Sequence, residues 1–243
     1  MVSKRTGTGD RLYYNQYDLS GDVGAVQTLR QSRAVQDVTG IDKDAMERLG
    51  VLPDGELAFT AFWNDSASQS YPVLSALPTT DVVASYFMGT AIGNAAASLN
   101  GKLTDLSVNR GQDGSLALTI PVLGNGSSLD WGVQLTNGKV TLASSGTAAP
   151  VDHGASTAFG GVAYLHVFSI GSGTATVKVQ HSSDNATYAD LITFTAATAA
   201  TFERKLTAAI TTTVNRYTSI TVTGTFTNLV YAVNFMRYVT SQT

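Results

Sequence analysis

Tight-turn dipeptides are the feature of this sequence that most restricts its fold. Asn-Gly and Asp-Gly pairs supply the positive φ angles that two-residue β-hairpin turns require. The chain contains five of them, at Asp54-Gly55, Asn100-Gly101, Asp113-Gly114, Asn125-Gly126 and Asn137-Gly138. This spacing predicts a meander of antiparallel strands through the first half of the chain.

The stretches around these turns have the two-residue period of strands. In Ser115–Val122 large apolar residues alternate with small ones, which predicts a strand buried on one face. Glu56–Trp63 is apolar on both faces and therefore needs cover on both. Later in the chain, Ser219–Phe226 alternates strictly, whereas Val162–Phe168 and Val230–Val239 are apolar on both faces, as expected of inner strands.

Only two short segments have a helical pattern. Ile41–Leu49 carries apolar residues at intervals of four, with Asp42 as a candidate N-cap. Tyr71–Leu77 has Pro72 near its start and Pro78 after its end. The predicted fold class is therefore all-β with one or two short helices.

Charged residues are scarce, and cysteine is absent. Only 14% of the 243 residues are charged, with a net charge of -3, whereas an ordinary soluble domain has about 25% charged residues. Such a surface favours assembly, and it argues against a protein that grips nucleic acid by neutralising phosphates. The absence of cysteine excludes disulfides, thiolate metal sites and cysteine nucleophiles. Neither a secretory signal nor a membrane-spanning helix is expected, so synthesis in a cytoplasm is predicted.

A run of small residues from Ala143 onward indicates a linker. We place the first domain at residues 1–148, with an N-terminal arm in residues 1–30. The linker is 149–154, and a second domain, a β-sandwich, is 155–243. The first domain holds 14 acidic and 10 basic residues and the rest of the chain 4 and 5, so the two parts have opposite net charge.

No catalytic motif is recognisable, so no enzymatic activity, cofactor or metal site is predicted. The three histidines, at 153, 166 and 181, are far apart; His166 lies among apolar residues and is interpreted as a core or interface side chain. Ser182–Asp190 is rich in short polar residues, which suit either ordinary turns or a calcium or sugar loop. An enzyme built on scattered aspartates is the weakest of the alternatives.

Aromatic residues concentrate in two places. In Leu12–Asp22 they precede the first strong element, and this segment packs on its own domain or serves as an arm that docks on a neighbouring copy. The residues assigned to this inter-subunit arm are Tyr13, Tyr14, Tyr17 and Leu19. Phe62 and Trp63 end the doubly apolar strand and are assigned to a core or an inter-subunit contact.

Several short blocks, in order, resemble the major tail protein (tail tube protein) of long, non-contractile-tailed, siphovirus-type phages of actinobacteria. They span about residues 15–140 and are Tyr17–Val23, Leu52–Trp63, Val73–Pro78, Gly89–Asn94 and Leu129–Gly132. The second domain resembles the Ig-like sandwich modules on the outer surface of such tubes, most clearly at Gln180–Leu191.

The resemblance implies a structural virion protein whose first domain, a β-sandwich or barrel, forms stacked hexameric rings. The rings make the tail tube, through which the genome is delivered. The implied partners are copies of itself, other tail proteins at the tube ends, and double-stranded DNA that passes without specific binding. The implied location is the virion tail, after synthesis in the host cytoplasm and without membrane insertion. A weak contact with a host-surface glycan falls to the C-terminal domain.

A channel for DNA should hold phosphates away from sticky cations, so a weakly acidic lining is expected. The candidates for this lining are Glu56, Asp81 and Asp105, which lie in or beside predicted strands. A different class of function also fits: a cell-surface or secreted glycan-binding β-sandwich module, with the first domain as a spacer.

Overall fold

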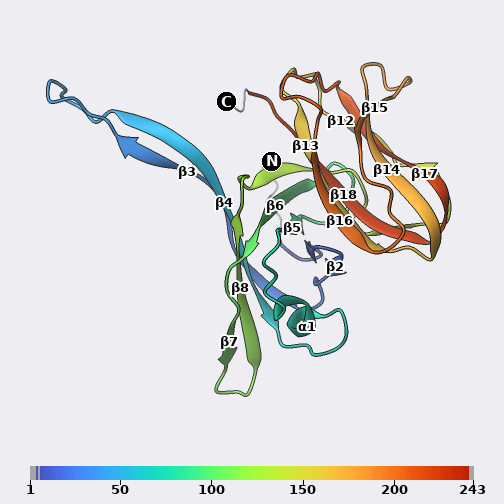
Figure 1. Cartoon of the computed structure of the whole chain (residues 1–243), viewed down its shortest axis with the longest axis horizontal. Helices are drawn as coiled ribbons and strands as arrows, with labels where there is room; N and C mark the ends of the chain where they lie inside the picture. The colour runs from blue at the N-terminus through green and yellow to red at the C-terminus, as the bar shows by residue number, and fades with distance from the viewer. Residues whose placement is uncertain (1–3, 5, 241–243) are drawn as a thin grey trace. The chain divides into compact units, whose positions relative to one another are not determined.

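The computed structural model describes residue 4 and residues 6–240, and these form an all-β protein, which confirms the predicted class (Figure 1). The described part contains eighteen strands and one short helix. It divides into two compact units. Unit 1 combines the chain up to Gly21 with Ser85–Ser98 and everything from Trp131 onward; unit 2 consists of Asp22–Ala84 and Leu99–Asp130.

Unit 2 is built on antiparallel strands in the order β3-β4-β8-β7, and β6 (Ala95–Leu103) also pairs with β8, on residues 122–124, while β7 pairs with residues 116–119. These strands are β3 (Val23–Asp37), β4 (Arg48–Phe62), β8 (Leu116–Gly124) and β7 (Ser107–Arg110). The alternation predicted for 115–122 is confirmed, because Leu118, Ile120 and Val122 are fully buried on one face. They lie opposite Leu57 and Phe59 of β4, which are also fully buried. The helix α1 (Ser70–Leu74) completes this unit together with parts of β5 and β6.

Three of the five turn dipeptides form turns, and two do not. Gly114, Gly126 and Gly138 have φ of 89°, 66° and 57°, as predicted. Gly55 and Gly101 instead lie inside β4 and β6 (Ala95–Leu103). A Cβ at Gly55 would lie 2.3 Å from the backbone nitrogen of Leu129, and one at Gly101 would lie 2.1 Å from the Leu123 carbonyl oxygen. These two glycines permit close approach of neighbouring backbone, which a dipeptide pattern does not distinguish from a turn.

The helix predicted for Ile41–Leu49 is wrong. Residues 38–47 form the connection of the β3–β4 hairpin, and β4 begins at Arg48. Nine residues are too few for a stable isolated helix, and cross-strand pairing of Asp37 with Arg48 takes its place. The second helix is confirmed in part, since α1 covers Ser70–Leu74.

Unit 1 contains a β-sandwich (Figure 1). One sheet has the order β16-β13-β18-β9, with β10 also on β18; the other has the order β11-β17-β14-β15, with β12 on β17. The strands are β9 (Asp130–Gln134), β10 (Val140–Leu142), β11 (Gly146–Thr147), β12 (Val151–Asp152), β13 (Gly161–Ser169), β14 (Ser172–Ser182), β15 (Ala189–Thr193), β16 (Thr201–Leu206), β17 (Tyr217–Thr227) and β18 (Leu229–Arg237). Leu165 and Val233 from the first sheet pack in one core with Val177 and Ile220 from the second.

The compact units divide the chain differently from the predicted boundary at 148–155. The predicted linker contains β12, whose Val151 pairs with Thr218 in the sandwich. Upstream of it, Val140 pairs with Tyr231, so the sandwich draws on residues well before the linker. Strands of only two or three residues give no readable alternation, which explains why this segment looked structureless.

The remaining strands of unit 1 continue its first sheet past β9 in the order β6-β5-β1-β2. They are β5 (Val82–Phe87), β1 (Arg11–Tyr14) and β2 (Tyr17–Asp18), besides β6. The β1–β2 pair with its flanks, residues 10–21, is called the N-terminal hairpin below. β13 is buried on both faces, as predicted for an inner strand, because its Leu165 faces the sandwich core while His166 faces the side on which Tyr13 lies.

Candidate assembly surfaces

The outer part of the β3–β4 hairpin, residues 33–54, is an exposed surface of unit 2, and we call it the outer hairpin. Figure 1 shows it as a two-stranded ribbon that extends beyond the rest of the unit. Every residue in it except Gly40 is exposed. Its exposed apolar side chains are Val35, Val38, Ile41, Met46, Leu49, Val51 and Leu52, with Ile41 completely exposed and Leu52 82% exposed.

The outer hairpin is well ordered at its tip in spite of this exposure. The Val38 N–H donates to the Glu47 carbonyl at 3.0 Å, and the Glu47 N–H donates to Thr39 Oγ1 at 2.8 Å. In the described structure, the first part of β4, residues 48–55, pairs with β3 and with no other strand. A two-stranded ribbon with no third strand and no cover is marginally stable in water, and clustered apolar exposure marks an interaction surface. The sequence reasoning missed this surface because it assigned the tip to a helix.

Two strands of unit 2, β3 and β7, lie at open edges, since each pairs with one neighbour only, although β6 also pairs with β8 further along. The solvent-facing side of this sheet carries hydroxyl side chains at its centre, flanked by Phe62 at one end and by the Glu56–Arg30 pair and Leu123 at the other. The cross-strand register places Thr60 opposite Thr119, and Thr119 opposite Ser107, on this face. An open edge exposes unpaired backbone groups that can pair with another chain.

The three carboxylates predicted to line the channel, Glu56, Asp81 and Asp105, each have a hydrogen-bonding or ionic partner in the structure. Glu56 lies on the solvent-facing side of the sheet, but Arg30 binds it at 2.9 Å. Asp81 accepts from Lys102 Nζ at 2.8 Å, and this hydrogen bond lowers the pKa of the Asp81 carboxyl. Asp105 precedes β7 and accepts from Ser107 Oγ at 2.7 Å. Two of the three candidates are therefore paired with a cation.

The aromatic pair at the end of β4 separates into two environments. Phe62 is 57% exposed, on the same side of the sheet as Thr60. Trp63 stacks on Tyr71 of α1, with ring centroids 3.8 Å apart. Phe62 is thus available for an inter-subunit contact, whereas Trp63 holds the helix segment within its own unit.

Most residues of the predicted aromatic arm are buried within the single chain. Tyr13, Tyr14 and Leu19 are at most 1% exposed, and Tyr17 is half-buried. Burial raises the pKa of both buried tyrosines above the ordinary value. β1 and β2 extend the sheet of unit 1, and the Tyr13 ring packs there against Phe87 and Phe168.

The histidines do not form a common site. His166 is completely buried, as its sequence neighbourhood predicted: its Nδ1 lies 2.5 Å from the Asn15 carbonyl and its Nε2 lies 2.8 Å from Ser85 Oγ. Burial lowers its pKa to about 4, so the ring is neutral near pH 7. His153 contacts Thr218 and His181 accepts from the Asn215 N–H. Each ring therefore has a structural partner.

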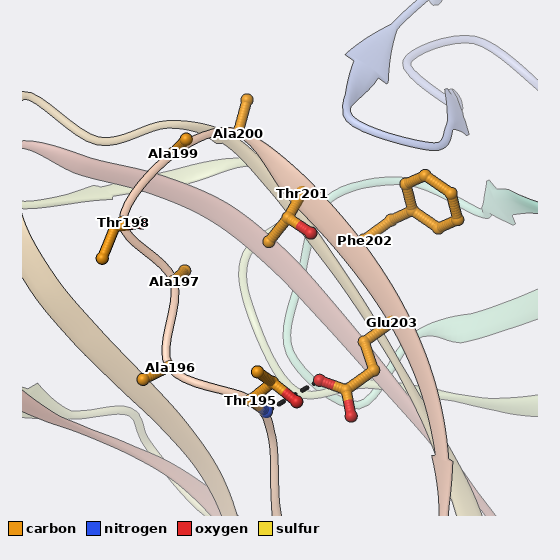
Figure 2. Close-up of a pocket in the computed structure, with 9 residues that line it drawn as sticks. All are labelled: Thr195, Ala196, Ala197, Thr198, Ala199, Ala200, Thr201, Phe202 and Glu203. Carbon is orange, nitrogen blue, oxygen red and sulfur yellow. Dashed lines mark hydrogen bonds between the residues drawn. The ribbon is translucent and has the colours of Figure 1, made fainter.

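Chemistry is equally sparse elsewhere in the described residues. They contain no group of three or more histidine, aspartate or glutamate side chains that could hold a metal ion, and no helix long and apolar enough to cross a membrane. Residues 195–203 line a pocket with a volume of about 500 Å³ (Figure 2). Its lining is mostly alanine and threonine, and its one carboxylate, Glu203, accepts the Thr195 N–H at 2.7 Å. In this described segment, no histidine, lysine or second carboxylate lines the pocket.

No family model matches the sequence, and no curated protein matches it. Among solved structures, the SPP1 Dit protein, described as a paradigm of the hub adsorption apparatus in Gram-positive-infecting phages, is 12% identical with a TM-score of 0.35; the match covers 94% of this chain and 99% of that chain. The phage p2 baseplate in its activated conformation with strontium matches at 10% identity and a TM-score of 0.33, over 94% and 98%. A chain of the same baseplate with calcium is 12% identical with a TM-score of 0.29, and the match covers 94% of this chain and 98% of that chain.

Proposed function

We propose that this chain is a structural protein of a phage tail, whose copies assemble into stacked hexameric rings that form the tail tube. The observation that carries the proposal is the sheet of unit 2, which has two open edges and a bare outer hairpin. Both features are liabilities in a monomer and become joints in an ordered polymer.

The open edges support a ring. β3 of one copy can pair with β7 of the next, which is a head-to-tail contact that leaves an identical pair of edges at the ends of the row. Repetition of such a contact closes into a ring when the rotation between copies allows it. The number six comes from the tail tube proteins that the sequence resembles.

The outer hairpin supplies the second joint, between rings. It is long enough to reach past its own sheet, and its apolar side chains lack cover on the described chain. Contact with the next ring would bury them, at about 1.5 to 3 kcal/mol for each fully covered Ile or Leu. Stacking of rings through these hairpins then gives a tube.

The solvent-facing side of the sheet is the proposed lining of the channel. Thr60, Thr119 and Ser107 offer hydroxyl groups, and Glu56 is balanced by Arg30. Such a lining gives phosphates few unpaired cations to bind, so double-stranded DNA passes without specific attachment. Asp81 and Asp105 remain the proposed acidic contributions, while other tail proteins meet the tube at its ends.

The test is negative-stain electron microscopy of the concentrated full chain, combined with mass photometry. Rings and hollow tubes are the expected result. A protein that stays a 25.4 kDa monomer at high concentration would overturn the proposal. If that monomer is also retained on a polysaccharide column, the glycan-binding function takes its place.

A further inference from the structure

The N-terminal hairpin is docked on unit 1 by a compact set of apolar contacts. Leu12, Tyr13, Tyr14 and Leu19 are buried. The Tyr13 ring packs edge-on against both Phe87 and Phe168, each with centroids 5.0 Å apart. Tyr13 is therefore the side chain that anchors the hairpin to β5 and β13.

Polar contacts fix the hairpin at both ends and at its turn. Asp10 accepts from the Tyr86 hydroxyl at 2.5 Å and from the Gly89 N–H at 2.7 Å. At the turn, the Asn15 carbonyl can only accept, so His166 Nδ1 carries the proton and donates to it. Asp18 pairs with Lys139 Nζ at 2.5 Å.

All the partners in this docking site come from later parts of the chain. They lie at the β5–β6 corner, on β13 and in the turn before β10. The hairpin itself is tied to them through a long route: the chain leaves unit 1 after Gly21, forms unit 2, and returns at Ser85. At Gly21, which is exposed, an added Cβ would meet nothing within 4 Å, so the chain has room to turn at this residue, between the hydrogen-bonded Ser20 and Asp22.

We propose that in the assembled protein the N-terminal hairpin of each copy docks on unit 1 of a neighbouring copy. Every contact named above would be kept, because the neighbour offers an identical site; this is the condition for domain swapping at low cost. The inference rests on the proposed ring assembly, which brings a neighbour's site to high effective concentration. Tyr13, Tyr14, Tyr17 and Leu19 would then be inter-subunit residues while remaining buried.

The Asp18–Lys139 ion pair allows a direct test with the natural sequence. Unlabelled and nitrogen-15-labelled proteins are mixed in equal amounts while unfolded, refolded together and concentrated to the assembly conditions. A water-soluble carbodiimide then condenses the Asp18 carboxylate with the Lys139 amine into an amide, taking up the released water to become a urea. Mass spectrometry of the linked peptides shows whether both halves carry the same label.

Docking on a neighbour predicts that about half of the Asp18–Lys139 links join one labelled and one unlabelled peptide. The internal control is the link between Lys178 and Asp190, 2.6 Å apart on β14 and β15, which must stay unmixed. Asp18→Asn should abolish the hairpin link and spare the control link.

Two results would overturn the proposal. One is an Asp18–Lys139 link found only within single-label molecules, which means that the hairpin stays on its own chain. The other is a missing Asp18–Lys139 link in a sample where the Lys178–Asp190 link forms. Electron microscopy of the same sample reports on rings separately, so mixed links without rings support the exchange while refuting the tube, and rings with unmixed links do the reverse.

Discussion

The outer hairpin offers the sharpest test of assembly, through the double substitution Ile41→Ser and Leu52→Ser. Both side chains are exposed in the single chain, Ile41 completely and Leu52 at 82%. Removing them takes nothing from the core, so the free energy of unfolding should change by no more than about 0.5 kcal/mol. The matched control is Ile210→Ser, which removes an apolar side chain that is 51% exposed in unit 1.

The expected loss in assembly follows from the area that the joint would cover. Full burial of an Ile or Leu side chain contributes about 1.5 to 3 kcal/mol. Weighted by their exposure, Ile41 and Leu52 together account for about 3 to 5 kcal/mol per copy. At 1.4 kcal/mol for each factor of ten, the critical concentration should rise by about 100- to 3,000-fold.

The assay measures the critical concentration by sedimentation of the polymer, alongside thermal unfolding followed by circular dichroism. The double variant should unfold like the natural chain and fail to pellet where the natural chain and the Ile210→Ser control do. An unchanged critical concentration in a normally folded double variant would show that the outer hairpin is not a joint.

Three further predictions concern stability and passage of DNA. Gly101→Ala should lower the free energy of unfolding in urea by about 1 to 3 kcal/mol, because its Cβ would lie 2.1 Å from the Leu123 carbonyl oxygen. The control Gly50→Ala, whose Cβ would meet nothing within 4 Å, should leave the free energy of unfolding unchanged. Equal losses in the two variants would refute the close approach of backbone at Gly101. The folded-state pKa of His166 is about 4, below its ordinary value of 6.5, so the unfolded chain binds more protons in that window and stability should fall as pH drops from 6.5 to 4; a His166→Gln variant with the same pH slope would contradict this. Glu56→Lys places a second cation beside Arg30 and should slow genome ejection from intact tubes; normal ejection would remove this position from the channel lining.

Strands were predictable where apolar residues recur at every second position. They were not predictable where the role of a residue depends on the backbone of a strand far away in the sequence. The alternating positions of Leu118, Ile120 and Val122 predicted that they share one face, and all three are buried. The same reasoning gave turns at Gly55 and Gly101, because a glycine needed for positive φ and one needed for close approach look alike until the opposing strand is known. The error at 41–49 has a similar origin, since three apolar residues at helical spacing weigh less than pairing with a strand that precedes them.

The candidate sites were harder to predict because they depend on partners far along the chain. His166 and Asn15 are 151 residues apart, and no local pattern indicates that this ring would hold the turn of the N-terminal hairpin. Phe62 and Trp63 are adjacent, yet one is exposed and the other stacks on Tyr71. Adjacent residues of a strand point to opposite faces, so the sequence could name the pair but could not assign each member to its role.

The pairing of the candidate carboxylates changes the electrostatics expected of the channel. Sequence alone predicts repulsion of DNA by carboxylates, yet Glu56 and Asp81 are each within 2.9 Å of a cationic nitrogen. Paired charges have little field beyond the Debye length, which is about 8 Å in physiological salt. Free passage of DNA would then depend less on repulsion than on the lack of unpaired lysine and arginine among the hydroxyl groups of the sheet. For this reason an added lysine at Glu56 is a stronger perturbation than the loss of a carboxylate. Glu56→Gln removes the closer of the two carboxylates beside Arg30 and leaves Asp54 at 3.8 Å, so its effect on ejection should fall between those of the natural chain and Glu56→Lys.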